Sequence, residues 1–168
     1  MFEIGEYVVY GNKGVCKVSK IGPIDIPGMS KERQYYTLSQ VYTRGSTIFT
    51  PVDNDKGVLR RILTPEEAKE LIDEAADMNP VWIQNDKERE QKFTETLRSA
   101  DTRSLFEMII ALYHRKERRL ADGKKATSTD ERYFHAAEDI LYGELGVSLG
   151  IGKDEVKDFI IKEFETVR

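Results

Sequence analysis

The hydrophobic pattern of the chain changes once, at residues 64–67, and this change limits the folds that the chain can adopt. Thr64-Pro65-Glu66-Glu67 combines a capping box with proline at the first helical position, which is a specific signal for a helix start. Before it, short apolar runs alternate with turn residues, and after it, apolar residues recur at helical spacing. The sequence therefore predicts a strand-rich domain over residues 1–63, followed by helices.

The first part contains five segments with the alternation, or the β-branched and aromatic content, of strands. They span residues 6–10, 15–21, 34–42, 47–52 and 58–62. Five short strands in so short a segment are typical of a small, strongly bent antiparallel β-barrel. The loop over residues 22–29 combines glycine and proline with apolar side chains, Ile24 among them, and we expect it to take part in binding.

Residues 64–81 are predicted to form a helical linker, and residues 82–168 a compact helical domain. The candidate N-caps of its helices are Asn85 or Asp86, Asp101 and Ser128. We expect the helix that begins after Ser128 to end at Gly146, and a final helix to follow Gly152. The predicted fold class is α+β, with a five-stranded antiparallel barrel followed by a compact all-helical domain.

Composition excludes several classes of protein. The 168 residues carry a net charge of -4, contain no apolar run long enough to span a bilayer, and begin without the pattern of a secretion signal. Cys16 is the only cysteine, which excludes an internal disulfide and a cysteine-based zinc site. We therefore expect a folded cytoplasmic protein that does not enter the membrane.

Patterns typical of enzymes are not found in the sequence. The two histidines, His114 and His135, lie in no metal-ligand spacing, and no Gly-rich loop has the spacing of a phosphate-binding motif. Carboxylates alternate with cations along helix surfaces, as in residues 86–90, where solvated salt bridges explain them. We expect no catalysis, no cofactor, no bound metal and no small-molecule substrate.

Positive charge is unevenly distributed along the chain. Residues 1–63 carry 9 Lys or Arg against 6 Asp or Glu, a charge of +3, and residues 64–168 carry 17 against 24, a charge of -7. Within this acidic part, residues 114–125 carry 6 Lys or Arg against 2 Asp or Glu. Such a cluster can bind phosphates, or it can be a solvated helix end that complements the helix dipole. The pattern alone leaves both explanations open.

Trp82 is the only tryptophan and lies in the segment Met78–Asp86, written MNPVWIQND. A lone tryptophan usually packs in a core or a domain junction. Trp82 instead follows a proline at the entrance to a polar helix, where a side chain can project. An apolar wedge beside basic residues is also how proteins unstack a base step from the minor groove.

Several strings, in order and spacing, resemble the CarD/CdnL family of bacterial RNA polymerase-binding transcription regulators. Residues 2–10 and Gly14-Val15 are similar to the opening of the family, and residues 35–38 and 48–52 to its later strands. Trp82 falls where the family has its tryptophan. The helical strings that resemble the family are Leu112-Tyr113-His114-Arg115 and Ile140-Leu141-Tyr142-Gly143-Glu144-Leu145.

The resemblance implies a Tudor-like N-terminal barrel that binds the polymerase β subunit and a helical domain that meets promoter DNA at the upstream edge of the transcription bubble. It places the polymerase contact on Ile48, Phe49, Thr50 and Pro51, to which the apolar loop adds Ile24. Trp82 becomes a wedge in the minor groove that stabilises the open complex. Phosphate contacts are expected from the cations near it, namely Lys87, Arg89, Arg115, Lys116, Arg118 and Arg119.

The segment after Trp82 departs from the family pattern, because Gln84-Asn85-Asp86 precedes the first cation, Lys87. We therefore expect weak DNA contacts, which suffice for a protein already tethered to polymerase. The alternative hypothesis is a polymerase-tethered adaptor whose acidic helical domain recruits another protein and does not touch DNA. We expect the chain to function as a monomer.

Overall fold

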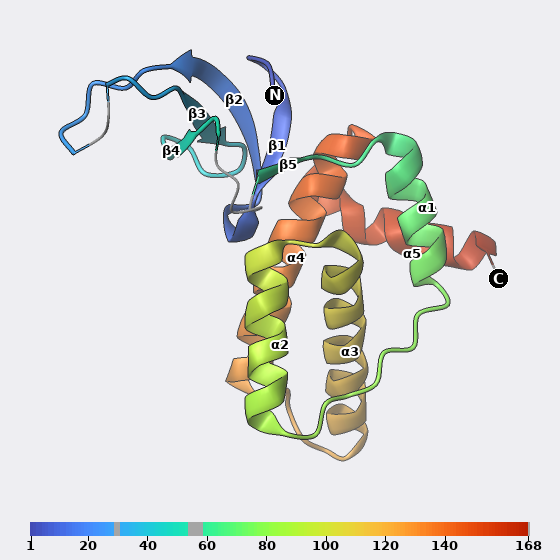
Figure 1. Cartoon of the computed structure of the whole chain (residues 1–168). Helices are drawn as coiled ribbons and strands as arrows, with labels where there is room; N and C mark the ends of the chain where they lie inside the picture. The colour runs from blue at the N-terminus through green and yellow to red at the C-terminus, as the bar shows by residue number, and fades with distance from the viewer. Residues whose placement is uncertain (29–30, 54–58, 168) are drawn as a thin grey trace.

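The N-terminal strands form one antiparallel sheet in the computed structural model, which describes residues 1–28, 31–53 and 59–167 (Figure 1). The strands are β1 (Tyr7–Tyr10), β2 (Val15–Gly22), β3 (Tyr35–Gln40), β4 (Thr47–Pro51) and β5 (Leu59–Arg61). Their order is β4-β3-β2-β1-β5, so β4 and β5 are the edges. The predicted α+β class and its five antiparallel N-terminal strands are confirmed, and the described strand pairings form an open sheet where a barrel was expected. Met29 of the predicted loop and Val58 of the predicted last strand lie outside the described residues.

The inner face of the sheet is apolar because side chains alternate along each strand. Val8, Cys16, Val18, Tyr36 and Leu38 form its buried cluster. A register shift between Val18 and Lys20 interrupts the pairing of β2 with β3, and irregularities of this kind bend a strand. Burial raises the pKa of the Cys16 thiol to about 11, so this cysteine is not ionised at neutral pH.

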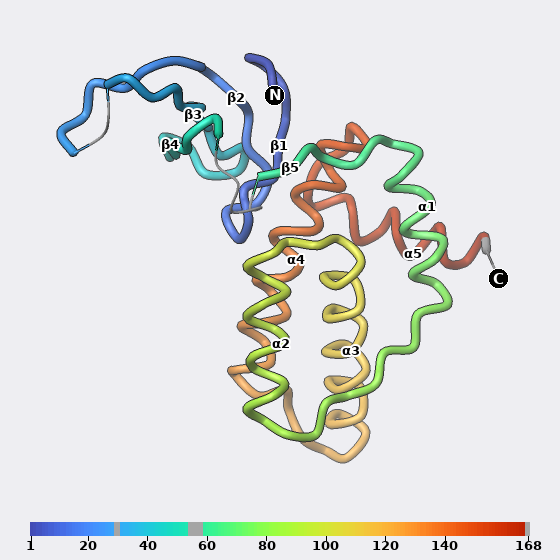
Figure 2. The backbone as a smooth tube through the Cα atoms, in the orientation of Figure 1, coloured from blue at the N-terminus to red at the C-terminus, as the bar shows by residue number. Residues whose placement is uncertain are grey.

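Among the described residues, five α-helices follow the sheet, and Figures 1 and 2 show their arrangement. They are α1 (Pro65–Ala75), α2 (Asp86–Ser99), α3 (Thr102–Ala121), α4 (Ser128–Leu149) and α5 (Val156–Val167). Short 3-10 turns lie between β1 and β2, η1 (Gly11–Lys13), and before α5, η2 (Lys153–Glu155). The predicted N-caps Thr64, Asn85 and Asp101 are confirmed, since each side chain accepts a hydrogen bond from the backbone N–H three residues later. α1 packs into the same buried cluster as α3, α4 and α5, and buries Ala68, Leu71, Ile72 and Ala75.

Two predicted boundaries of α4 are wrong. Its N-cap is Thr127, whose hydroxyl accepts a hydrogen bond of 3.1 Å from the N–H of Asp130, and Ser128 is the first helical residue. The helix also continues past Gly146 and ends at Gly150, which adopts the left-handed conformation with φ of 71°.

Gly146 is needed for close packing and does not end the helix. A Cβ at Gly146 would lie 3.1 Å from the carbonyl oxygen of Ile151 and 3.1 Å from the hydroxyl of Tyr42. A Cβ at Gly143 would lie 3.0 Å from Cε2 of the same tyrosine. The Tyr42 hydroxyl donates a 3.0 Å hydrogen bond to the carbonyl of Gly143. These two glycines therefore let the loop between β3 and β4 rest on α4.

A buried ion pair joins the sheet to the helices beside this contact. The guanidinium of Arg60, on β5, donates to both carboxylate oxygens of Glu144, on α4, at 2.8 and 2.7 Å, and to the carbonyl of Ala100 at 2.7 Å. Glu144 also accepts from the N–H of Leu63 at 2.9 Å, and the Ser148 hydroxyl donates to the Leu63 carbonyl at 2.7 Å. We call these five residues the interdomain network.

The hydrophobic core also crosses the junction. Val9 of β1 is buried in the helical cluster, although its neighbour Val8 belongs to the cluster inside the sheet. The strand therefore contributes one face to each core, and the two domains form one packed unit. Among the described residues, no helix is long and apolar enough to cross a membrane.

The ion pair between Arg61 and Glu67 at the start of α1 can be tested by pH titration. The Arg61 guanidinium binds both oxygens of the Glu67 carboxylate and, with the Thr64 N–H, lowers the pKa of Glu67 from 4.5 to about 2. The stability contributed by this carboxylate is therefore present above about pH 4.5 and is lost as the pH falls through about 2. Arg61→Ala is expected to raise this pKa toward 4.5, as NMR titration of the Glu67 carboxylate can measure. Arg33→Ala, which removes an exposed pair with Asp53, is the control and leaves the Glu67 pKa in place.

Candidate nucleic-acid interface

The segment between α1 and α2 runs in extended form across α3 and shows opposite exposure at alternate residues. Met78 and Trp82 are half-buried and pack on the helical core, whereas Asn79 and Val81 are exposed. Pro80 fixes its own φ and restricts Asn79 to extended conformations. The segment therefore places Val81, which is 89% exposed, on a stiff stretch of backbone.

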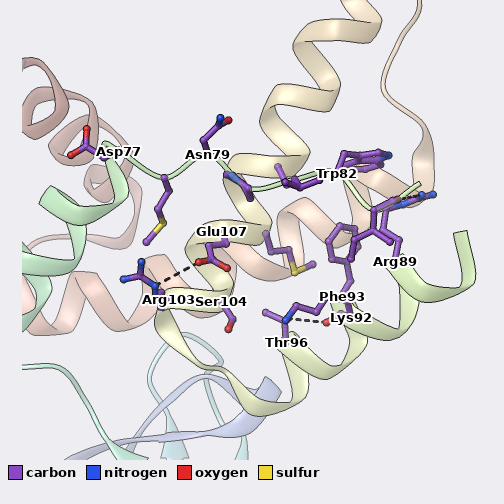
Figure 3. Close-up of a pocket in the computed structure, with 16 residues that line it drawn as sticks. Asp77, Asn79, Trp82, Arg89, Lys92, Phe93, Thr96, Arg103, Ser104 and Glu107 are labelled. Atoms are coloured by element: carbon purple, nitrogen blue, oxygen red, sulfur yellow. Dashed lines mark hydrogen bonds and ion pairs between the residues drawn. The ribbon is translucent and has the colours of Figure 1, made fainter. Parts of the chain in front are cut away.

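The Trp82 indole has a core side and a cationic side (Figure 3). Its ring centroid lies 6.2 Å from that of Phe93, in an edge arrangement. The guanidinium carbons of Arg89 and Arg115 lie over the indole, 4.7 and 5.4 Å from its centroid. Trp82 is thus a partial core anchor that also holds two arginines at the surface through cation–π attraction.

A hollow of about 300 Å³ opens beside this indole, on the side of α3. We call it the Trp82 hollow, and its lining residues are Asn79, Pro80, Val81, Trp82, Gln84, Ala111, His114, Arg115 and Arg118. None of these residues is acidic, and Arg115 and Arg118 bring two permanent positive charges. A site of this composition suits an anionic backbone with flat or apolar groups attached to it.

Arg89 is held in place by its neighbours. Its guanidinium donates to the Asp86 carboxylate at 2.7 Å and to the carbonyl of Ile83 at 2.9 Å, and the side chain is only 16% exposed. The carboxylate that follows Trp82 in the sequence is therefore paired with Arg89. Asn85 is also occupied, because it caps α2. The acidic character of this stretch thus does not extend to the Trp82 hollow.

A second hollow, of about 410 Å³, lies on the other side of the segment, against α2 and α3 (Figure 3). It has mixed charge, since Asp77 and Glu107 line it with Arg103 and Lys92. Arg103 pairs with Glu74 at 2.6 Å and with Glu107 at 3.6 Å. Because acidic residues line the second hollow and none lines the Trp82 hollow, the Trp82 hollow is the better phosphate site of the two.

The structure brings together four of the seven residues predicted to meet DNA. Trp82, Arg115 and Arg118 line the Trp82 hollow, and Arg89 lies over the indole but lines the second hollow. The other three lie elsewhere: Lys87 lines a different surface hollow beside Tyr133, Lys116 is exposed outside the lining, and Arg119 donates to the carbonyl of Lys125 at 2.7 Å.

Sequence reasoning assigned three of the nine lining residues to DNA binding, and His114 and Val81 are among the six that it missed. Ala111, His114, Arg115 and Arg118 are spaced i, i+3, i+4 and i+7, so one face of α3 presents all four. That spacing could have identified His114. Side chains alternate between the two sides of the segment around Pro80. The exposure of Val81 can be predicted from this alternation only once Trp82 is known to face α3.

The residues predicted to contact polymerase divide between the core and the surface. Ile48 packs against the cluster inside the sheet, and Thr50 is buried, with 1% of its surface exposed. Phe49 and Pro51 are half-buried on the edge strand β4. Ile24 is buried, contrary to the expectation that it takes part in binding, whereas Ile26, two residues later in the same loop, is exposed.

Within the part of the chain that the structure describes, no group of three or more His, Cys, Asp or Glu residues is placed to hold a metal ion. Comparison with curated proteins gives no match. Residues 2–63 match the family model of the CarD-like/TRCF RID domain, a type of domain that interacts with the RNA polymerase β subunit and is not known as an enzyme. The N-terminal part of this chain, residues 2–63, is therefore a CarD-like/TRCF RID domain.

Proposed function

We propose that this chain is a transcription regulator that binds the polymerase β subunit through its N-terminal domain and stabilises the open promoter complex through its helical domain. The observation that carries the proposal is the placement of a cationic hollow, free of acidic residues, on a domain packed firmly against a polymerase-interacting domain. The start of α2, beside Trp82, lies at the end of the helical domain remote from the sheet (Figure 1). One molecule can thus bridge polymerase and DNA.

The place of β4 in the sheet supports the polymerase contact. Among the described strands, β4 pairs only with β3 and forms an edge of the sheet. An extended segment can add to such an edge, while side chains at alternate positions provide selectivity. Phe49 is the large apolar side chain on this edge that does not belong to the buried cluster. We place the polymerase contact there, with Pro51 next to it.

The chemistry of the Trp82 hollow supports a DNA contact. Arg115 and Arg118 suit phosphates on either side of a minor groove, and the apolar residues of the segment, Trp82 and Val81, suit its floor. Two or three cations give little affinity alone. Attachment to polymerase compensates for this, since tethering raises the effective concentration of the domain at the promoter.

Stabilisation of the open complex requires only differential binding. A domain that contacts melted promoter better than closed promoter shifts the equilibrium toward the melted form. A preference of about 1.4 kcal/mol changes the ratio of open to closed complexes about tenfold. The chain needs no catalytic group for this effect.

Phe49→Glu is expected to weaken binding of the full-length chain to a purified polymerase β fragment by about tenfold or more, because the new carboxylate loses its hydration without gaining a partner. Surface plasmon resonance measures the affinity. Ile161→Glu, at an exposed apolar residue of α5, is the matched control and leaves binding unchanged. Failure of the wild-type chain to bind the fragment would contradict the proposal.

The adaptor hypothesis remains as a second candidate because of one feature. An apolar groove of about 800 Å³ lies between α3, α5 and the end of α1, and its lining includes Phe106, Ile110, Tyr113, Ile161 and Phe164. A partner helix with an apolar face would fit it. Photocrosslinking within a promoter complex separates the candidates: probes at positions 81 and 82 give a DNA adduct from at least one position under the main proposal and only protein adducts under the adaptor hypothesis.

A further inference from the structure

Val81 is the most exposed large apolar residue between α1 and α5. It is 89% exposed, although its neighbours Pro80 and Trp82 are half-buried. Nothing in the packing of the domain requires an apolar side chain at this position. Its backbone is stiffened by Pro80, and a β-branched side chain has few rotamers to lose, so fixing Val81 in a complex costs little conformational entropy.

Trp82, by contrast, is already engaged by neighbouring side chains. Two guanidinium groups lie over the indole, and Arg89 is further tied to Asp86 and to the carbonyl of Ile83. A base that stacked where these groups lie would first have to displace an arginine. Val81 can enter a groove with no rearrangement of the protein.

The charges around Val81 favour DNA as its partner. It lines both hollows. On the side of the Trp82 hollow, His114, Arg115 and Arg118 lie beside it with no acidic residue in the lining, whereas the second hollow carries mixed charge. A protein partner with an apolar patch gains nothing from this excess of positive charge, whereas the phosphates that flank a minor groove are attracted by it.

We infer that Val81 is the leading apolar contact of this chain with the minor groove, and that it favours A·T over G·C base pairs at the contacted step. Trp82 remains in place behind it and holds Arg115 toward a phosphate. The selectivity has a simple origin: the exocyclic N2 amine of guanine protrudes into the minor groove, where a branched apolar side chain cannot accept its hydrogen bond. This inference rests on the proposed function.

The contacted step is located first, by benzoylphenylalanine placed at position 81, 82 or 161 of the full-length chain in an open promoter complex. The expected result is a DNA adduct from position 81. Position 161, exposed on α5, is the control and gives no DNA adduct. Adducts from position 82 alone would overturn the inference and leave the proposed function intact. DNA adducts from neither 81 nor 82 would contradict both.

The base preference is then measured as the increase in open-complex lifetime caused by the protein on promoters that differ only at the contacted step. With A·T the wild-type increase should be about fivefold larger than with G·C, because Val81 covers the N2 amine of guanine without offering it an acceptor. Inosine·C, which lacks the N2 amine, should restore the A·T result.

Val81→Ala is expected to reduce the lifetime increase on A·T and to narrow the difference between A·T and G·C. Ile161→Ala is the matched control and should change neither quantity. An inosine·C promoter that behaves like G·C, or a Val81→Ala variant with the full lifetime increase and the full preference, would overturn the inference. The proposed function would still stand on the wild-type lifetime increase.

Discussion

Arg60→Met is expected to lower the free energy of unfolding by about 3 kcal/mol, because it leaves a buried carboxylate without its cation. Glu144 is 0% exposed, and Arg60 supplies two of its hydrogen bonds. The carbonyl of Ala100 loses its donor as well. The Leu63 N–H alone cannot compensate for the charge. Urea denaturation followed by circular dichroism measures the change.

Arg33→Met is the matched control for this loss. Arg33 pairs with Asp53, but both side chains are largely exposed, so its replacement should change stability by less than about 0.5 kcal/mol. The double variant Arg60→Met with Glu144→Met should recover most of the lost stability, because no buried charge remains, although the Leu63 N–H is left without its acceptor. Equal stability of Arg60→Met and the wild type would show that Glu144 finds another partner or water.

Trp82→Ala is expected to shorten the open-complex lifetime about tenfold relative to wild type, equivalent to about 1.4 kcal/mol. It removes the surface that holds Arg89 and Arg115 in position. It should also reduce the free energy of unfolding by about 2 kcal/mol, less than a fully buried aromatic residue would cost, because the indole packs only partly on the core. Transcription assays with purified polymerase and thermal denaturation measure the two effects.

Met78→Ala separates the two consequences of the Trp82 substitution. Met78 lies in the same segment, is also half-buried and packs on the same core, but it does not line the Trp82 hollow. It should destabilise the fold to a similar degree, about 2 kcal/mol, and keep the lifetime effect. If Met78→Ala shortened the lifetime as much as Trp82→Ala does, the effect would belong to folding and not to DNA contact.

Local signals predicted most of the architecture. The strand alternation and the caps at Thr64, Asn85 and Asp101 act over a few residues and were confirmed. The start of α4 was misplaced by one residue, since Thr127 with Asp130 and Ser128 with Glu131 have the same spacing. The end of α4 could not be predicted from neighbouring residues. Gly146 leaves room for Tyr42, which lies more than a hundred positions earlier in the chain.

The candidate site was predictable in composition but not in geometry. The basic cluster and Trp82 were recognised separately, and only the folded segment joins them. Lys116 is next to Arg115 in the sequence, yet one helical step turns it by about 100°, away from the hollow. Arg119 donates a hydrogen bond to the loop that follows its own helix. For Ile24, composition indicated an apolar loop but could not tell which way the side chain turns.

The burial of Val9 in the helical core limits how this protein can be divided into fragments for experiments. An isolated fragment of residues 1–63 would expose that valine and the half-buried Ile62 and Leu63, while the remaining helices would keep a gap where these side chains pack. Truncation is therefore a poor tool for assigning roles to the two ends, because each fragment loses part of its own interior. The sheet is not an interchangeable module here, and point substitutions in the intact chain are the way to separate polymerase binding from DNA binding.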